Sequence, residues 1–125
     1  MTDENTGKSI LVVDDTKSMR KMVVAVLQGA GYSVEEAADG VEALEKAKGR
    51  VFDLVVTDHN MPRMSGVDLV RALRALPEYD EVALLVLSTE GGADLKNEGR
   101  AAGASGWMTK PFVPEKMLDI VAQFL

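Results

Sequence analysis

The stretch VVTDHNMPRMSG, Val55–Gly66, begins as an apolar run and ends on a carboxylate, Asp58, before a loop rich in turn-forming residues. Its uninterrupted, β-branched start is typical of a strand that is buried on both faces, as in a parallel sheet. Asp, Asn, Pro and Gly also close strands, so this stretch by itself is compatible with a simple turn. Its meaning depends on whether other strands end on polar groups in the same way.

Three further short runs share this pattern of an apolar strand that ends on a charged or hydroxyl side chain. The runs are SILVVDD at 9–15, VALLVLS at 82–88 and GWMTK at 106–110, which end on Asp14 and Asp15, on Ser88 and on Lys110. A weaker strand is predicted at YSVEEAA, 32–38. Because the carboxyl ends of parallel strands meet at one edge of a sheet, these side chains are predicted to lie together.

Segments of helical periodicity separate the strands. Their limits are Ser18 as N-cap and Gly31 for the first, Asp39 and Gly49 for the second, Val67–Leu76 before Pro77 for the third, Ala93–Gly103 for a weak fourth, and Pro114 in the first turn of the fifth. The alternation predicts an α/β fold, a doubly wound parallel sheet of about five strands with about five helices on its two faces.

Length and composition restrict the possible functions. The 125 residues fit one domain, which we place at 9–125 after a polar, flexible N-terminal tail at 1–8. The chain has no cysteine, which excludes disulfides and thiolate metal sites, and its formal charge of −6 disfavours a nucleic-acid footprint. No apolar run approaches the ~20 residues of a membrane span. We expect a cytoplasmic monomer that binds neither nucleic acid nor membrane.

The predicted edge of the sheet carries the groups of a phosphoryl-transfer site. Three carboxylates in a small volume repel one another unless a cation joins them, and Mg²⁺ prefers oxygen ligands of this kind. Asp15 and Asp58 could bind Mg²⁺ directly and Asp14 through water, while Lys110 and Ser88 could contact a phosphoryl oxygen. Asp58 is the expected nucleophile, because it lies between the ion and Lys110.

Other features have ordinary structural interpretations. His59, the only histidine, follows Asp58 on extended chain, so we expect it to point away from the ion and face solvent. The basic residues of the first helix are expected to form a solvated face, and the methionines and the apolar residues of the last helix to pack in the core. The basic residues are Lys17, Arg20 and Lys21, and the methionines are Met19, Met22 and Met117. The apolar residues of the last helix are Met117, Ile120, Val121 and Phe124.

Four fragments, ILVVDD, VVTDHNMPRMSG, LLVLST and GWMTKPF, together resemble the receiver domains of two-component response regulators. The resemblance covers essentially the whole chain, and it implies a CheY-like, flavodoxin-like sheet of strand order 2-1-3-4-5. It also implies the roles of the polar residues. These are Asp58 as phosphoacceptor, Asp14, Asp15, Asp58 and the backbone carbonyl of Asn60 as Mg²⁺ ligands, and Ser88 and Lys110 as contacts of the phosphoryl group.

Within this family the chain is most similar to CheY-like single-domain chemotaxis regulators, because it stops after its fifth predicted helix. Trp107 stands where the family usually carries Tyr or another aromatic, and the Trp departs from the best-known chemotaxis pattern at the position that switches together with Ser88. Asn60 and Glu90 occupy the positions that shape the path of the water that removes the phosphate. The family also implies a cis Lys110–Pro111 bond, which the sequence by itself does not decide.

The resemblance implies a phosphoacceptor that takes a phosphoryl group from a CheA-like histidine kinase and signals through its fourth helix, fifth strand and fifth helix. Further partners in chemotaxis would be a flagellar motor switch protein and a phosphatase. We do not expect an enzyme, since such a protein catalyses only its own phosphorylation and dephosphorylation. A phosphate sink, a single-domain regulator outside motility and an unphosphorylated interaction module stay open as alternatives.

Two other classes with this architecture fit the residues less well. A flavodoxin-like FMN binder needs a Ser/Thr-rich phosphate loop after the first strand, where this chain has Asp14 and Asp15. A haloacid-dehalogenase-like phosphatase typically places a second Asp two residues after its nucleophile, where this chain has Asn60. Receiver-shaped modules that are never phosphorylated usually lack an acidic residue or the Lys, and none is missing here.

Overall fold

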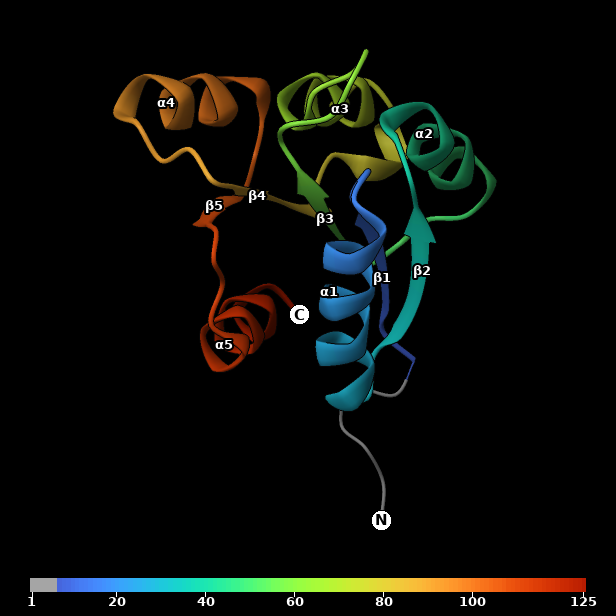
Figure 1. Ribbon diagram of the computed structural model, residues 1–125. Helices are drawn as coiled ribbons and strands as arrows, with labels where there is room; N and C mark the ends of the chain where they lie inside the picture. Colours follow the sequence, from blue (N-terminus) through green and yellow to red (C-terminus); the bar gives the residue numbers. More distant parts are fainter. Residues whose placement is uncertain (1–6) are drawn as a thin grey trace.

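Five short segments pair into one parallel sheet in the computed structural model of the protein, which describes residues 7–125 (Figure 1). The strands are β1 (Ser9–Val13), β2 (Ser33–Ala37), β3 (Leu54–Asp58), β4 (Ala83–Ser88) and β5 (Gly106–Thr109). Their order is β2-β1-β3-β4-β5, and every neighbouring pair is parallel. The predicted fold class and strand order are therefore confirmed, while most of the predicted tail at 1–8 lies outside the described residues.

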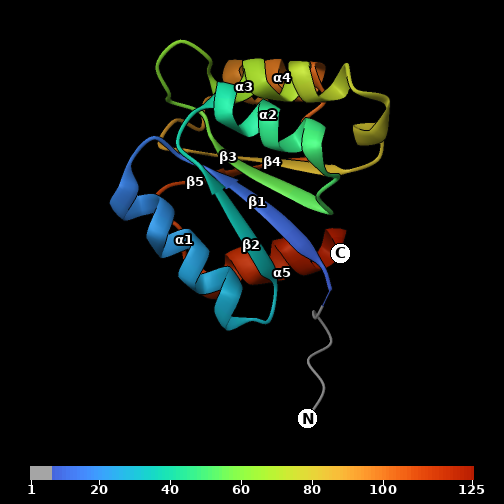
Figure 2. The same ribbon diagram turned by 90° about the vertical axis from the view of Figure 1, so that its right-hand side faces the viewer.

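Helices connect the strands and cover both faces of the sheet. They are α1 (Lys17–Gly29), α2 (Gly40–Gly49), α3 (Gly66–Arg74), α4 (Ala93–Ala102) and α5 (Pro114–Phe124), with a 3-10 turn at Pro77–Tyr79. Figure 2 shows α1 and α5 on one side of the sheet and α2, α3 and α4 on the other. Within residues 7–125, no helix is both long and apolar enough to cross a membrane.

Side chains that alternate along the central strands divide the core into two layers. Ile10 and Val12 pack in a cluster with residues of α1 and α5, and Leu11 and Val13 pack in a cluster with residues of α2 and α3. All five residues of β1 are buried, and so are all five of β3. A strand that is covered on both faces needs apolar side chains on both, which is why these strands read as uninterrupted apolar runs.

The helix ends agree with the predictions in part. The Asp39 side chain caps α2 by accepting the Glu42 N–H at 2.8 Å, as expected. Helix α1 begins two residues earlier than predicted, with Thr16 rather than Ser18 as its N-cap, and the Thr16 side chain makes no capping hydrogen bond. Helix α3 is followed by the separate 3-10 turn instead of continuing to Leu76.

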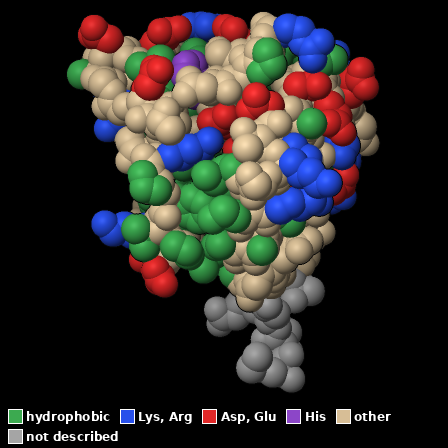
Figure 3. Space-filling view, viewed as in Figure 1, with side chains coloured by type: hydrophobic (Ala, Val, Ile, Leu, Met, Phe, Trp, Pro, Cys, Tyr) green, Lys and Arg blue, Asp and Glu red, His purple; other side chains and the backbone are tan. Residues whose placement is uncertain are grey.

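Two side chains that were predicted to lie in the core are exposed. Met22 is 55% exposed, because the adjacent Val23 and Val24 take the face of α1 that packs on the sheet. Phe124 is 41% exposed on the last turn of α5, three residues beyond Val121, the last buried residue of that helix. Figure 3 shows hydrophobic side chains on the surface of this layer, over α5 and the adjoining part of α1.

Tyr79 contacts three backbone groups at the end of α2 and in the segment that follows it. Its hydroxyl lies 2.9 Å from the carbonyl oxygen of Arg50 and 3.1 Å from that of Ala47, and it accepts the Phe52 N–H at 3.2 Å. Because Tyr79 is fully buried, Tyr79→Phe is expected to leave polar backbone groups unpaired and to lower the free energy of unfolding by about 1 to 3 kcal/mol. Urea unfolding measures the change, and an unchanged midpoint with an unchanged slope would contradict it.

Candidate functional site

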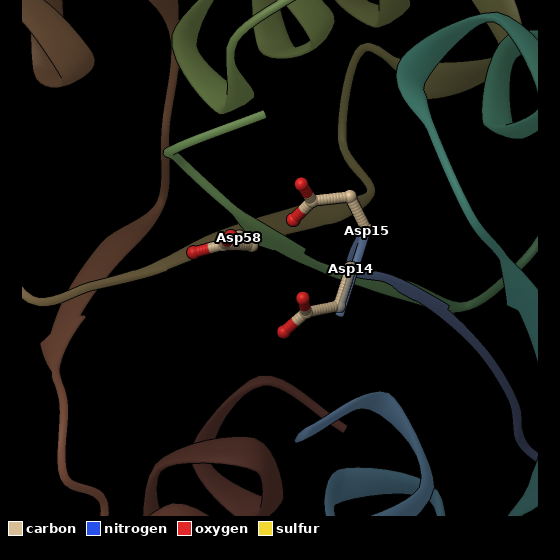
Figure 4. A group of neighbouring side chains, drawn as sticks. All are labelled: Asp14, Asp15 and Asp58. Atoms are coloured by element: carbon tan, nitrogen blue, oxygen red, sulfur yellow. The ribbon is translucent and has the colours of Figure 1, made fainter. Parts of the chain in front are cut away.

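Three carboxylates gather at the carboxyl ends of β1 and β3 (Figure 4). Asp14 and Asp15 directly follow β1, and Asp58 is the last residue of β3. One carboxylate oxygen from each residue lies within 4.8 Å of the other two. The register of the two strands, with Val13 opposite Thr57, brings both strand ends to the same edge of the sheet. The structure thus places the three predicted acidic residues together.

Burial distinguishes the members of this acidic cluster. Asp14 and Asp58 are buried, whereas Asp15 is exposed. Asp14 Oδ1 accepts the Thr16 N–H at 2.9 Å, and Asp14 Oδ2 lies 3.5 Å from Lys110 Nζ. Burial raises the pKa of Asp14, and the negative charges of Asp58 and Asp15 raise it further. The hydrogen bond from the Thr16 N–H and the positive charge of Lys110 lower this pKa, but by less. The ionised cluster is therefore under electrostatic strain that a cation would relieve.

Lys110, which directly follows β5, brings an ammonium group to the cluster. Its Nζ lies 3.0 Å from Asp58 Oδ1, and its side chain is 12% exposed. Apart from this ion pair, Asp58 Oδ1 is a buried oxygen without a hydrogen-bond partner among the described residues. The Lys110 N–H donates to the Ser88 carbonyl at 2.7 Å, and the Lys110–Pro111 bond is cis. The Asp58 carboxylate is thus buried and held beside a cation.

The loops that follow β3 and β4 supply the remaining predicted residues. Ser88 is fully buried, and its Oγ accepts the Glu90 N–H at 3.0 Å. Asn60 and Glu90 are exposed, and the Asn60 amide donates to Thr89 Oγ1 at 3.3 Å. These contacts connect the two loops at the rim of the acidic cluster.

His59 and Trp107 pack against each other next to these loops. Their ring centroids are 5.7 Å apart, with the planes tilted by 49°. His59 is partly buried, and its Nδ1 is buried without a hydrogen-bond partner within residues 7–125, so the predicted solvent-facing orientation is confirmed only in part. Alternation turns His59 away from Asp58, but the face to which it turns is covered at this point by the Trp107 ring.

Two residues outside the predicted site also hold it in place. Arg20 is not part of a solvated face: its guanidinium donates to the Asp14 carbonyl at 2.7 Å and to Glu36 at 2.9 Å, and its side chain is 14% exposed. At Gly66, a Cβ would lie 2.5 Å from the Asp58 carbonyl oxygen, so a residue without a side chain lets α3 begin this close to β3. A glycine at the start of a predicted helix is a sequence signal for the close approach at Gly66. No sequence pattern indicates the contact between Arg20 and the Asp14 carbonyl.

Comparison with known proteins identifies the family. A family model described as "Response regulator receiver domain" matches residues 10–122. The chain belongs to this family. This receiver domain is 39% identical over 109 residues to "Chemotaxis protein CheY-3" of Vibrio cholerae, in an alignment that covers 86% of this chain and 84% of that protein. It is also 38% identical over 111 residues to "Chemotaxis protein CheY" of Pseudomonas aeruginosa, covering 88% and 90% of the two chains.

Solved structures agree with this assignment. The receiver domain superposes on the crystallised chemotaxis response regulator CheY4 of Vibrio cholerae with a TM-score of 0.91 and 47% sequence identity, covering 96% of this chain and 100% of that one. It is likewise similar to a response regulator from Chloroflexus aurantiacus, with a TM-score of 0.89, 32% identity and coverage of 94% and 96%. The chain is therefore a signalling protein of the two-component type and is similar to chemotaxis regulators.

Receiver domains bind Mg²⁺ at an acidic pocket, and the cluster in this chain fits such an ion. Its donor atoms are all carboxylate oxygens, the ligands that Mg²⁺ prefers. Two of the three carboxylates are buried, and the pKa of Asp14 is raised by that burial, so a divalent ion would offset the cost of keeping them ionised.

Proposed function

We propose that this receiver domain accepts a phosphoryl group on Asp58 from the phosphohistidine of a CheA-like histidine kinase. The observation that carries the proposal is the Asp58 carboxylate, which is 5% exposed and has one oxygen 3.0 Å from Lys110 Nζ. Within residues 7–125 that oxygen accepts no hydrogen bond. A carboxylate held in this way can form an acyl phosphate, while the ammonium group stabilises the charge that arrives with the phosphoryl group.

In the transfer step, an Asp58 oxygen forms a bond to phosphorus as the phosphorus–nitrogen bond of the phosphohistidine breaks. The electron pair of that bond stays on the imidazole of the kinase, which takes up a proton. Lys110 and the Ser88 hydroxyl donate to phosphoryl oxygens. The Ser88 oxygen accepts the Glu90 N–H, and this bond does not use the hydroxyl hydrogen. The hydroxyl hydrogen can therefore turn toward the phosphoryl group.

The proposed Mg²⁺ ligands are Asp15, Asp58 and the Asn60 backbone carbonyl, with Asp14 acting through water. The ion, when bound, supplies positive charge that offsets the carboxylates and the phosphoryl oxygens. The indirect role of Asp14 is supported by its existing contacts, since one oxygen accepts the Thr16 N–H and the other faces Lys110.

Loss of the phosphate requires a water molecule that attacks phosphorus and breaks the bond to Asp58, releasing inorganic phosphate. Asn60 and Glu90 are exposed at the rim and can orient this water by hydrogen bonds. Asn60→Leu and Glu90→Leu are each expected to slow the loss of phosphate by about fivefold or more. The decay of the phosphorylated form, followed by mass, measures the rates, and wild-type decay in both variants would exclude this route.

We further propose that the output surface is formed by α4, β5 and α5, with Ser88 and Trp107 as the switching residues. In support, the Trp107 N–H donates to the Glu90 carbonyl at 2.9 Å, which connects β5 to the loop after Ser88. The chemotaxis relatives favour a flagellar motor switch protein and a phosphatase as partners. A phosphate sink or a regulator outside motility would use the same site with different partners. An unphosphorylated module is less favoured, because every group of the site is present.

Incubation with acetyl phosphate and Mg²⁺, followed by intact-mass measurement, tests the proposal. The expected result is the gain of one phosphoryl group, which EDTA prevents. A protein that gains none in the presence of Mg²⁺, with a functioning receiver as positive control, would instead support the unphosphorylated interaction module. Binding to a flagellar switch peptide with and without phosphorylation then separates the motor regulator from the phosphate sink.

A further inference from the structure

A glycine in α4 provides the space in which the Trp107 ring lies. Gly99 is the only buried residue of this helix, and a Cβ at this position would lie 2.9 Å from Trp107 Cζ3 and 3.1 Å from Cε3. The Gly99 backbone has no left-handed φ, so conformation does not require glycine there. Glycine is disfavoured inside helices. Its presence is therefore explained by the approach of the indole ring.

Two hydrogen bonds connect the Trp107 indole, through Glu90, to Ser88 of the proposed phosphorylation site. The Ser88 Oγ accepts the Glu90 N–H at 3.0 Å, and the Glu90 carbonyl accepts the Trp107 Nε1–H at 2.9 Å. The loop between these residues and α4 contains Gly91 and Gly92, which have no side chains to anchor it, and both are exposed. The position of Glu90 therefore depends on where the indole lies.

We propose that Gly99 is a positioning residue for the phosphoryl chemistry, because it seats Trp107 so that the indole holds Glu90 and, through Glu90, Ser88. This inference rests on the proposed function of Asp58. Gly99 lies in α4, outside the proposed phosphate and Mg²⁺ contacts, yet it would influence how long the phosphate stays on Asp58. His59 packs against the same ring with centroids 5.7 Å apart, which adds a second contact that fixes its place.

A methyl group at Gly99 would displace the indole and break its bond to the Glu90 carbonyl. Glu90, proposed to orient the attacking water, would then no longer be held at the rim of the site. Gly99→Ala is therefore expected to slow the loss of phosphate by about threefold or more, in the same direction as Glu90→Leu. Displacement of the ring is also expected to change the fluorescence of Trp107, the only tryptophan, before any phosphorylation.

The decisive experiment compares Gly99→Ala in two backgrounds, wild type and Trp107→Phe, whose ring has no N–H donor. Each variant is phosphorylated with acetyl phosphate and Mg²⁺, and the decay of the phosphorylated form is followed by intact mass. Gly99→Ala is expected to slow decay when Trp107 is present and to have no further effect in the Trp107→Phe background. Gly49→Ala is the matched control, since a Cβ at this helical glycine meets nothing within 4 Å.

The outcomes separate this inference from the proposed function. Absence of phosphorylation in the wild-type protein would remove the proposed function itself. Normal phosphorylation with an unchanged lifetime in Gly99→Ala would overturn the inference alone, and so would an equal effect of Gly99→Ala in both backgrounds, since that is the behaviour of a merely structural residue. If Gly99→Ala does not fold, Trp107→Phe by itself decides, because loss of the N–H donor is expected to slow decay while a wild-type lifetime overturns the inference.

Discussion

Replacing Asp58 by Asn is expected to abolish phosphorylation by acetyl phosphate and Mg²⁺. The amide has the size of the carboxylate and can occupy the same buried place beside Lys110, but its oxygen is not a nucleophile that forms a stable acyl phosphate. Within residues 7–125, no other carboxylate combines the same burial with a cation at 3.0 Å. Intact-mass measurement after incubation is expected to show one added phosphoryl group in the wild-type protein and none in Asp58→Asn.

The matched control for this variant is Asp119→Asn, which removes an exposed carboxylate on α5, away from the acidic cluster. The control is expected to gain one phosphoryl group, as the wild type does. Urea unfolding of both variants shows whether each is folded under the conditions of the assay. A phosphoryl group retained by folded Asp58→Asn would assign the nucleophile to another residue, with Asp14 and Asp15 as the nearest candidates.

Burial on both faces made the sheet predictable from the sequence. Strands such as β1 and β3 are covered by helices on either side, so their apolar runs are continuous and their ends are marked by the first carboxylate. Parallel pairing then requires that Asp14, Asp15 and Asp58 meet at one edge, which the register of β1 and β3 shows. The strand order came from the family resemblance rather than from the residues.

Contacts between elements that are distant in sequence were not predictable in the same way. Alternation indicated the direction in which His59 points, but not that Trp107, 48 residues later by their numbering, covers that direction. Helical periodicity placed Arg20 on a polar face, but not within 2.7 Å of the Asp14 carbonyl. Met22 shows the converse error, because an apolar residue beside a core stripe can face solvent when its neighbours fill the contact with the sheet.

Asp15→Asn is expected to weaken Mg²⁺ binding about tenfold more than Asp14→Asn. Asp15 is exposed, and a carboxylate that faces the rim can give an oxygen directly to the ion. Asp14 is buried, with one oxygen on the Thr16 N–H and the other 3.5 Å from Lys110 Nζ, which leaves it the water-mediated position. Calorimetric titration of each variant with Mg²⁺ measures the two affinities, and equal losses would contradict the ranking.

When Mg²⁺ is removed with EDTA, the same two variants are expected to differ in stability, and here Asp14→Asn should have the larger effect. Burial raises the pKa of Asp14, which means that the folded protein disfavours its ionised form and loses stability as the pH rises above the ordinary pKa of a carboxyl group. Asp14→Asn removes this cost, so its free energy of unfolding should exceed that of the wild type at neutral pH. The gain should shrink once the pH falls below the raised pKa and vanish near the ordinary pKa of a carboxyl group, where Asp14 is protonated in both the folded and the unfolded wild type. Asp15→Asn, at an exposed position, should change the unfolding free energy little, and a gain as large as that of Asp14→Asn would show that repulsion within the cluster outweighs burial.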